Sequence, residues 1–318
     1  MTEHAGEQEE PPDVELGERR VRGLVYGFRH LAVGDGPGIR TTVLLKGCPL
    51  RCLWCSEPEK RSFDVGVRID RGRCIDCGAC EEVCPVGVAT RPSREPVPAA
   101  AGLQLCQACA ACVDACPANA RSLSGRILTP HDVLSQVWAD RSYHEASGGG
   151  MTISGGEPTA QPEFTVELLS LAKRTGIHTC VATSGWAPWE CLQPMVPLTD
   201  LFICKLKAVS PGLHKRLTAV SSEPVLSNAR RLVAAGCRVL LRVGVAPGLN
   251  DSPEEVRSLG EFIASLGRRV PVEVVVQAAG SASGPVGAPP QPRVHRTAEE
   301  AAEGVRSILW LCGVHVVG

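Results

Sequence analysis

The sequence lacks a long apolar run, an export signal and an excess of charge of either sign. A helix that crosses a membrane needs roughly 18 or more consecutive apolar residues, so we expect none. Without an export signal, we expect a cytoplasmic protein. The 33 lysines and arginines nearly balance the 34 aspartates and glutamates. This balance gives no electrostatic reason to expect binding to nucleic acid or to an anionic membrane surface.

Cysteine, by contrast, is abundant, with 16 in 318 residues. In a reducing cytoplasm, clustered cysteines ligate metals or act in catalysis more often than they form disulfides. Eleven of the 16 lie in three groups between Cys48 and Cys116. The others stand singly, mostly in apolar stretches, and we interpret them as buried thiols. They are Cys180, Cys191, Cys204, Cys237 and Cys312.

Two of the three groups are copies of one pattern, C-x2-C-x2-C-x3-C-P. Two-cluster bacterial ferredoxins have this spacing, and the fourth cysteine of each run ligates the cluster of the other run. A zinc ribbon or a disulfide knot is the alternative, but the paired register with a proline after each run favours two 4Fe–4S clusters. We therefore predict one cluster on Cys74, Cys77, Cys80 and Cys116, and a second on Cys106, Cys109, Cys112 and Cys84.

The third group is Cys48, Cys52 and Cys55, in the stretch KGCPLRCLWCSEPE (46–59). A structural zinc site uses four ligands, whereas three thiolates on one loop suit a metal centre that keeps one coordination position open. A chance cluster of buried thiols is the alternative. Trp54 lies between the last two cysteines and can shield a cluster from solvent.

After the cysteine-rich segment, short apolar runs alternate with helical patterns. Such runs between helices predict parallel βα units in a covered sheet. We expect helices over 164–174, 228–236 and 253–267, and an open barrel of six βα units with its chemistry at the carboxyl ends of the strands. The six strands are expected at 41–46, 151–154, 178–184, 201–206, 239–245 and 272–277.

The same patterns divide the chain into three parts. Residues 1–20 are polar and acidic, and we expect a disordered tail. Residues 21–67 and 123–318 are assigned to the α/β partial barrel, and 68–122 to an inserted ferredoxin-like module. The segment SGGEP (154–158) follows the second strand. Its glycines let the backbone approach a ligand closely, and Glu157 can accept hydrogen bonds from an ammonium group.

The three-cysteine loop and the SGGEP segment resemble those of the radical S-adenosylmethionine (SAM) superfamily. The resemblance implies a third 4Fe–4S cluster, the catalytic one, on the three-cysteine loop, with the amino and carboxylate groups of SAM on its free iron. Longer stretches are similar to the glycyl-radical-enzyme activating enzymes, including the subgroup with a ferredoxin-like insert. They are GDGPGIRTTVLLKGCPLRCLWC (34–55), DLFICKLKAVSPGLHKRLTAVSSEPVLSN (200–228) and RVGVAPGLND (242–251).

The family resemblance also implies a reaction, partners and site residues. Reductive cleavage of SAM gives a 5′-deoxyadenosyl radical, which takes hydrogen from a backbone glycine of a partner glycyl radical enzyme. A low-potential donor such as flavodoxin or ferredoxin supplies the electron, and the two auxiliary clusters either relay electrons or are structural. The implied SAM contacts are Trp54, Cys55, Ser56, Ser154, Gly155, Gly156, Glu157, Thr183, Ser184, Lys205, Lys207 and Arg242.

The sequence departs from this family in several places. Gly34 and Glu57 replace a usual histidine and asparagine, and residues 275–278 lack the L-P-Y-H that is frequent there. Similar enzymes also use two acidic residues to hold a monovalent cation beside the SAM carboxylate. Those positions are here Ala182 and Lys205, so the lysine ammonium is a candidate replacement for the cation.

These departures keep two alternatives open. One is a radical SAM enzyme that acts on a small molecule or on a different peptide. The other is a degenerate member that binds clusters and SAM but activates nothing.

Overall fold

The computed structural model describes residues 21–91, 106–267, 270–277 and 297–317. The predicted tail at 1–20 and Ala278 lie outside these ranges. Within them, no helix is both long enough and apolar enough to cross a membrane.

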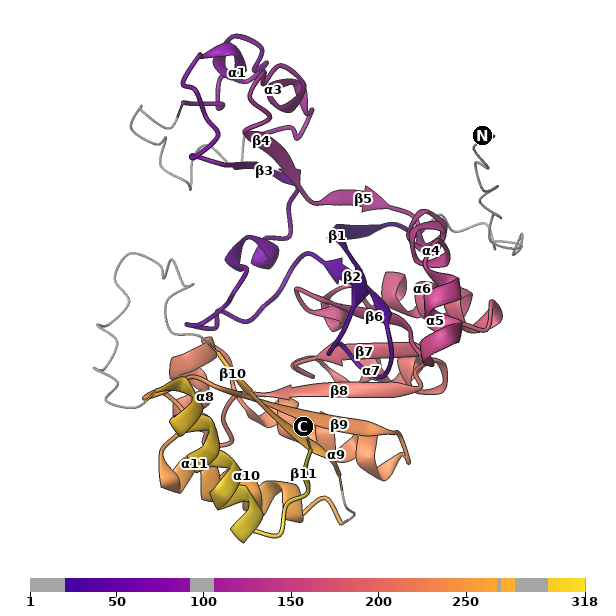
Figure 1. Cartoon of the computed structure of the whole chain (residues 1–318), viewed down its shortest axis with the longest axis vertical. Helices are drawn as coiled ribbons and strands as arrows, with labels where there is room; N and C mark the ends of the chain where they lie inside the picture. The colour runs from indigo at the N-terminus through magenta and orange to yellow at the C-terminus, as the bar shows by residue number, and fades with distance from the viewer. Residues whose placement is uncertain (1–20, 92–105, 268–269, 278–296, 318) are drawn as a thin grey trace, which may run out of the picture.

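A nine-stranded sheet forms the centre of the described part of the chain, in the order β11-β10-β9-β8-β7-β6-β2-β1-β5 (Figure 1). Six neighbouring strands run parallel in chain order. Because β5 and β11 end the sheet at opposite edges, the barrel is open, as predicted. The six strands match the predicted ones to within one residue at each end: β2 (Arg40–Leu45), β6 (Gly150–Gly155), β7 (Thr179–Thr183), β8 (Leu201–Leu206), β9 (Val239–Val245) and β10 (Val272–Val276).

Three further strands of this sheet were not predicted. β1 (Gly23–Ala32) pairs antiparallel with β2, and β5 (Arg126–Leu128) pairs antiparallel with β1. β11 (Val316–Val317) adds a parallel edge next to β10. β5 and β11 are too short to show a period in the sequence. At the start of β1, a Cβ on Gly23 would come within 2.3 Å of the Phe164 ring, so glycine permits the helix that carries Phe164 to pack there.

Helices cover the outer face of the parallel strands, as the βα pattern predicts (Figure 1). Their inward side chains and the strands form one large apolar core, in which Leu168, Phe202 and Leu241 are fully buried. Three helices begin at side-chain caps, provided by Thr129, Ser252 and Thr297. The helices are α4 (Pro130–Trp138), α5 (Arg141–Ser147), α6 (Pro162–Arg174), α7 (Trp189–Leu192), α8 (Pro211–Thr218), α9 (Glu223–Ala234), α10 (Pro253–Ala264) and α11 (Ala298–Leu311), with 3-10 turns η1 (Pro58–Arg61), η2 (Pro158–Ala160) and η3 (Gln193–Leu198).

The cysteine-repeat module projects from the barrel on a pair of antiparallel strands, β3 (Gly66–Ile69) and β4 (Arg121–Ser124) (Figure 1). Each repeat contributes one short helix, α1 (Ala79–Glu82) or α3 (Ala111–Asp114). The predicted boundaries of the insert, after residue 67 and after residue 122, each fall inside one strand of this pair.

Candidate functional site

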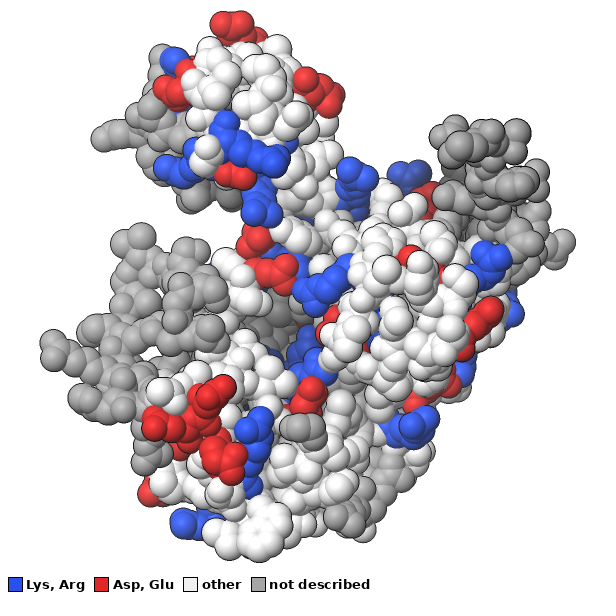
Figure 2. Space-filling model, in the orientation of Figure 1, with Lys and Arg blue, Asp and Glu red and all other residues white. Residues whose placement is uncertain are grey.

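A cavity of about 380 Å³ lies at the carboxyl ends of the parallel strands. On the face drawn in Figure 2, Lys and Arg side chains gather around the hollow between the insert and the barrel. Most of the predicted SAM contacts line the cavity. These are Trp54, Cys55, Ser56, Ser154, Gly155, Gly156, Glu157, Ser184, Lys205, Lys207 and Arg242. The predicted cluster ligands Cys48 and Cys52 line it too, whereas Thr183 is not among its lining residues.

The three-cysteine loop follows β2 and is fixed on both sides by backbone hydrogen bonds. The Gly47 and Cys48 amides donate to the carbonyls of the last two residues of η1, at 2.7 and 3.0 Å. The Arg51 and Leu53 amides donate to carbonyls at the end of α8, at 2.8 and 3.0 Å. The loop therefore has a defined shape that is built by the protein itself.

The cysteines of this loop are half-buried. Burial raises the pKa of Cys48 to about 12 and also raises the pKa of Cys52. The positive charge of Lys207 acts in the opposite direction on both thiols. Metal binding at this loop must therefore displace the thiol protons, and Lys207 favours the resulting thiolates.

The ligand set of the loop is that of a cluster with an open iron rather than of a closed single-ion site. In the described part of the chain, no three His, Cys, Asp or Glu side chains close around one metal ion. A four-iron cluster is wider than one ion, and each thiolate binds a different iron. Cys48, Cys52 and Cys55 line one cavity together, and that cavity has no fourth cysteine among its described lining residues. The residues present thus fit a cluster with one iron left open.

Glu157 ties the end of β6 to the end of β7. One of its oxygens accepts from the Thr183 hydroxyl at 2.5 Å, and the other accepts from the Ser184 amide and hydroxyl at 2.8 and 2.6 Å. The side chain is buried, and Thr159 donates to it as well. The sequence suggested this carboxylate as an acceptor for a ligand ammonium, but its oxygens are already engaged by the protein.

The glycines of the same segment allow close contact with the three-cysteine loop. The Gly156 amide donates to the Leu45 carbonyl at 2.7 Å, and the Glu157 amide donates to the Gly47 carbonyl at 2.8 Å. A Cβ on Gly156 would lie 2.3 Å from the Gly47 oxygen. Segment and loop are therefore held as one unit at the mouth of the barrel.

Three cations reach the cavity from β8 and from its neighbour β9. Lys205 Nζ donates to the Ser154 hydroxyl at 3.0 Å, and Lys207 Nζ donates to the Lys205 carbonyl at 3.4 Å. Arg242 already has protein partners, with its Nε 2.6 Å from Glu273 and a terminal nitrogen 2.5 Å from the Gly34 carbonyl. Arg242 thus joins two segments of the wall, while the two lysines keep donors toward the cavity.

Several lining residues were not predicted, among them Arg29, Asp35, Lys60 and Gln277. Asp35 accepts from Thr42 at 2.7 Å and pairs with Arg29 at 3.2 Å. Its position in the quoted GDGPG stretch was the signal that could have identified it. Lys60 is buried, pairs with Glu57 at 2.5 Å and lies over the Tyr26 ring. No local pattern in the sequence indicates that pair.

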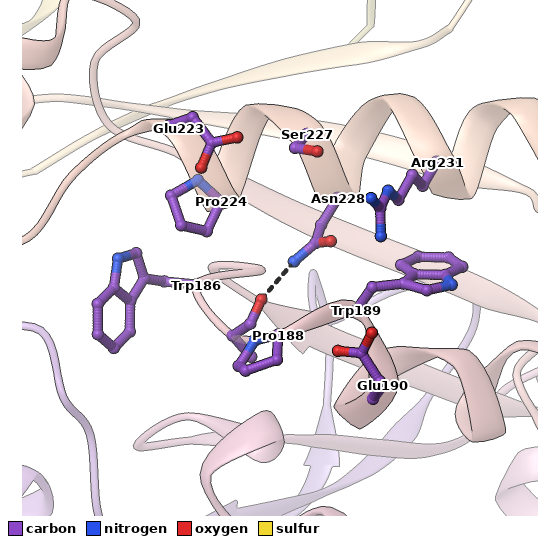
Figure 3. A pocket seen from close by; sticks show the side chains of 10 residues that line it. Trp186, Pro188, Trp189, Glu190, Glu223, Pro224, Ser227, Asn228 and Arg231 are labelled. Carbon is purple, nitrogen blue, oxygen red and sulfur yellow. Dashed lines mark hydrogen bonds between the residues drawn. The ribbon is translucent and has the colours of Figure 1, made fainter.

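A second cavity, of about 500 Å³, lies beside the loop that follows β7 (Figure 3). The Asn228 side chain on α9 donates to the carbonyls of Gly185 and Ala187, both at 2.8 Å. Arg231 lies over the Trp189 ring at 5.6 Å. These contacts clamp the loop that carries Ser184 and so help to shape the first cavity.

In the insert, cysteines from the two repeats lie near one another. Burial raises the pKa of Cys112, Arg121 opposes this, and the thiols of Cys106 and Cys84 raise it further. Cys84 belongs to the first repeat and the other two to the second. This proximity is what the predicted exchange of the fourth cysteine requires.

The fourth cysteine of each repeat has a thiol that is prepared to ionise. Burial raises the pKa of Cys84, but the backbone amides of residues 86–89 together lower it below the usual value, and amides that follow Cys116 lower its pKa likewise. The Ala120 amide lies 3.3 Å from the Cys116 sulfur. Amides that point at sulfur stabilise the thiolate, the form that binds iron.

Comparison with known proteins gives the family. Residues 105–260 match the radical SAM superfamily, and residues 73–121 match the 4Fe–4S dicluster domain. A (2S)-3-sulfopropanediol dehydratase activating enzyme of Klebsiella oxytoca is 37% identical over 244 residues, which are 76% of this chain and 77% of that protein. A choline trimethylamine-lyase activating enzyme of Oleidesulfovibrio alaskensis is 39% identical over 242 residues, 76% of this chain and 78% of that protein.

The chain belongs to the glycyl-radical-enzyme activating enzymes of the radical SAM superfamily. A solved domain of a pyruvate-formate lyase-activating enzyme from Bacteroides vulgatus is 26% identical, with a TM-score of 0.45, and covers 54% of this chain and 98% of that chain. Membership of this family makes the chain an iron–sulfur protein that uses SAM. The resemblance and the fold class inferred from the sequence are thereby confirmed.

Proposed function

We propose that this activating enzyme cleaves SAM reductively and uses the 5′-deoxyadenosyl radical to take a hydrogen atom from a backbone glycine of a partner glycyl radical enzyme. The observation that carries the proposal is one cavity that joins the three-cysteine loop, the SGGEP segment and two lysines with free donors. Relatives at 37% and 39% identity that are named activating enzymes support it.

In this proposal, the reduced cluster supplies one electron that breaks a carbon–sulfur bond of SAM. The described residues hold and orient the components. Cys48, Cys52 and Cys55 would ligate the cluster, and Lys207 would offset the charge of their thiolates. The segment of Gly155 and Gly156 would carry the methionine part of SAM on its backbone, while Glu157 keeps that segment and the β7 end in place. Trp54 and Ser56 would lie beside the bound SAM.

We infer three 4Fe–4S clusters, one in the barrel and two in the insert. The match of residues 73–121 to a dicluster domain supports the pair. The predicted ligand sets, with Cys84 and Cys116 exchanged between repeats, remain the proposal for the insert. The closeness of Cys84, Cys106 and Cys112 supports that exchange.

A low-potential donor such as flavodoxin or ferredoxin is proposed as the electron source. The proposed setting is the cytoplasm, because thiolates in three cluster spacings need a reducing compartment. The balanced charge of the sequence continues to give no reason to propose a membrane or nucleic acid as a partner.

The deciding experiment uses anaerobically reconstituted protein with SAM, a reductant and a candidate partner glycyl radical enzyme. We expect 5′-deoxyadenosine and an electron paramagnetic resonance doublet from a glycyl radical. A triple Cys48/Cys52/Cys55→Ala variant should give neither, and its iron should fall from about twelve atoms to about eight.

Two other outcomes would replace the proposal. 5′-Deoxyadenosine without a glycyl radical on any tested partner indicates a different substrate. Fully loaded protein that binds SAM but gives no 5′-deoxyadenosine indicates a degenerate member of the family.

A further inference from the structure

The ammonium group of Lys205 lines the cavity and has one hydrogen-bond partner among the described residues. Lys205 lies on β8, in register with Arg242 on β9. Its Nζ reaches the Ser154 hydroxyl at 3.0 Å, at the carboxyl end of β6. An ammonium has three donors, and this neutral hydroxyl engages one of them.

The carboxylates near Lys205 are engaged elsewhere. Glu157 accepts from Thr183 and Ser184, and Glu273 accepts from Arg242. Asp35 pairs with Arg29 and accepts from Thr42. Within the described ranges, no carboxylate forms an ion pair with Lys205. The cavity wall therefore presents a positive charge whose partner is not supplied by these residues.

The surroundings of Lys205 disfavour an unpaired charge. Burial, together with Lys207 and Arg242, lowers the pKa of Lys205 to about 8, against the opposing charges of Glu157 and Asp35. A buried ammonium is stabilised when an anion with suitable geometry joins it. An anionic group of a ligand would supply the ion-pair partner that Lys205 lacks among the described residues.

We propose that Lys205 binds the carboxylate of SAM and serves as its built-in counter-charge. The inference rests on the proposed use of SAM and adds the residue that recognises one end of it. The carboxylate is the anionic group of SAM, and Lys205 lies against the segment assigned to the methionine part. The charge of Lys207 acts on the thiols of Cys48 and Cys52. We therefore assign Lys205 to SAM and Lys207 to the cluster ligands.

The apolar residue at position 182 of the neighbouring strand agrees with this role. Ala182 on β7 is buried and pairs in register with Ile203 of β8. Glu157 reaches the end of β7, but its oxygens already accept from Thr183 and Ser184. With the counter-charge attached to the protein, SAM binding should be the same in sodium and in potassium salts at equal ionic strength.

The test is a thermodynamic cycle that combines substitution of Lys205 with removal of the SAM carboxylate. It uses cluster-loaded protein without reductant. Wild type, Lys205→Met and Lys215→Met are compared by anaerobic calorimetry with SAM and with decarboxylated SAM. Lys215 is exposed on α8 and serves as the matched loss of one positive charge. We expect Lys205→Met to weaken SAM binding about tenfold or more. Binding of the decarboxylated analogue should change less than about twofold, and Lys215→Met should affect neither ligand.

A pH series adds a readout that a purely structural role would not give. The SAM amino group titrates in the same range as Lys205, so the quantity to measure is the ratio of wild-type to variant affinity. This ratio should be largest below pH 8 and fall toward one as the pH rises past the pKa of Lys205. A Lys205→Arg variant should retain most of the preference for SAM over its analogue.

Equal losses for both ligands would overturn the proposal, because Lys205 would then only shape the cavity. Unchanged SAM affinity in Lys205→Met, with wild-type iron content, would also overturn it. If loaded wild type binds neither ligand, the proposed use of SAM fails first, and this inference fails with it. Iron content and circular dichroism, measured for every variant, separate these outcomes from misfolding.

Discussion

The barrel and the insert hold their cysteines in opposite ways. The three-cysteine loop of the barrel is fixed by hydrogen bonds to η1, α8 and the SGGEP segment, above a core that spans the whole sheet. Among the described residues of the insert, the buried apolar cluster consists of Cys80, Ala89 and Cys112, so two of these three are predicted iron ligands. The barrel is built to receive a cluster, whereas the insert needs its clusters in order to have a core.

Removal of iron should give the largest contrast between the two regions. Under anaerobic chelation, we expect the insert to unfold, because its folding free energy is mainly metal-binding free energy. Hydrogen exchange measured by mass spectrometry should show complete loss of protection in α1 and α3, with β6 to β9 unchanged. An insert that keeps its protection without iron would contradict the comparison.

Loss of Cys84 should damage one cluster and spare the other. If the fourth cysteines are exchanged, Cys84→Ala weakens the cluster on Cys106, Cys109 and Cys112, and the first repeat keeps its own cluster with Cys116. Mössbauer spectra and iron content of this variant should be compared with those of Cys116→Ala, the matched change in the second repeat. A Cys84→Ala protein that loses the cluster of its own repeat instead would show that the ligands are not exchanged.

Replacing one carboxylate oxygen of Glu157 by an amide nitrogen tests how much the hydrogen bonds of this side chain stabilise the barrel site. Glu157→Gln places an amide against the amide of Ser184 or the hydroxyl of Thr183, so a donor meets a donor. We expect a loss of about 2–4 kcal/mol in the free energy of unfolding of the barrel. Chemical denaturation is the measurement, and Glu190→Gln, at an exposed position, is the control with little expected effect.

The smallest effect concerns backbone strain in the two repeats. The residue after the second cysteine has φ of 82° at Gly78 and 65° at Ala110. An alanine at such an angle carries a backbone strain of roughly 1–2 kcal/mol. Glycine avoids this strain but loses more conformational entropy on folding, so its net advantage is smaller. We expect Ala110→Gly to stabilise the loaded insert by about 1 kcal/mol and Gly78→Ala to destabilise it by a similar amount. Thermal unfolding of the two variants should shift in opposite directions, and shifts of the same sign would rule out the strain argument.

The parallel strands were predictable because each is a run of apolar residues between helical patterns. β3 and β4 were not, since they are four residues each and carry Arg68 and Arg121. They pair across the whole insert, and no local pattern records such a distant partner. The ligand cysteines, by contrast, were predictable from local sequence, because a cluster requires ligands at fixed spacings within a short stretch.

In the site, residue types were easier to predict than residue roles. Glu157 and Arg242 were both identified as contacts, and both lie at the cavity. Their partners Ser184, Glu273 and Gly34 come from other strands and loops. Whether a charged group faces a ligand or a neighbouring strand depends on that packing, so the sequence alone could not settle it.

The paired strands β3 and β4 also make the insert separable by design. Gly66 and Ser124 are direct partners across this pair, so the chain leaves the barrel and returns to it at adjacent points. Facing residues in antiparallel strands are about 5 Å apart, a gap that a two-residue turn can close. A gene could therefore lose, gain or exchange the whole cysteine-repeat module at this position without re-routing any strand of the barrel.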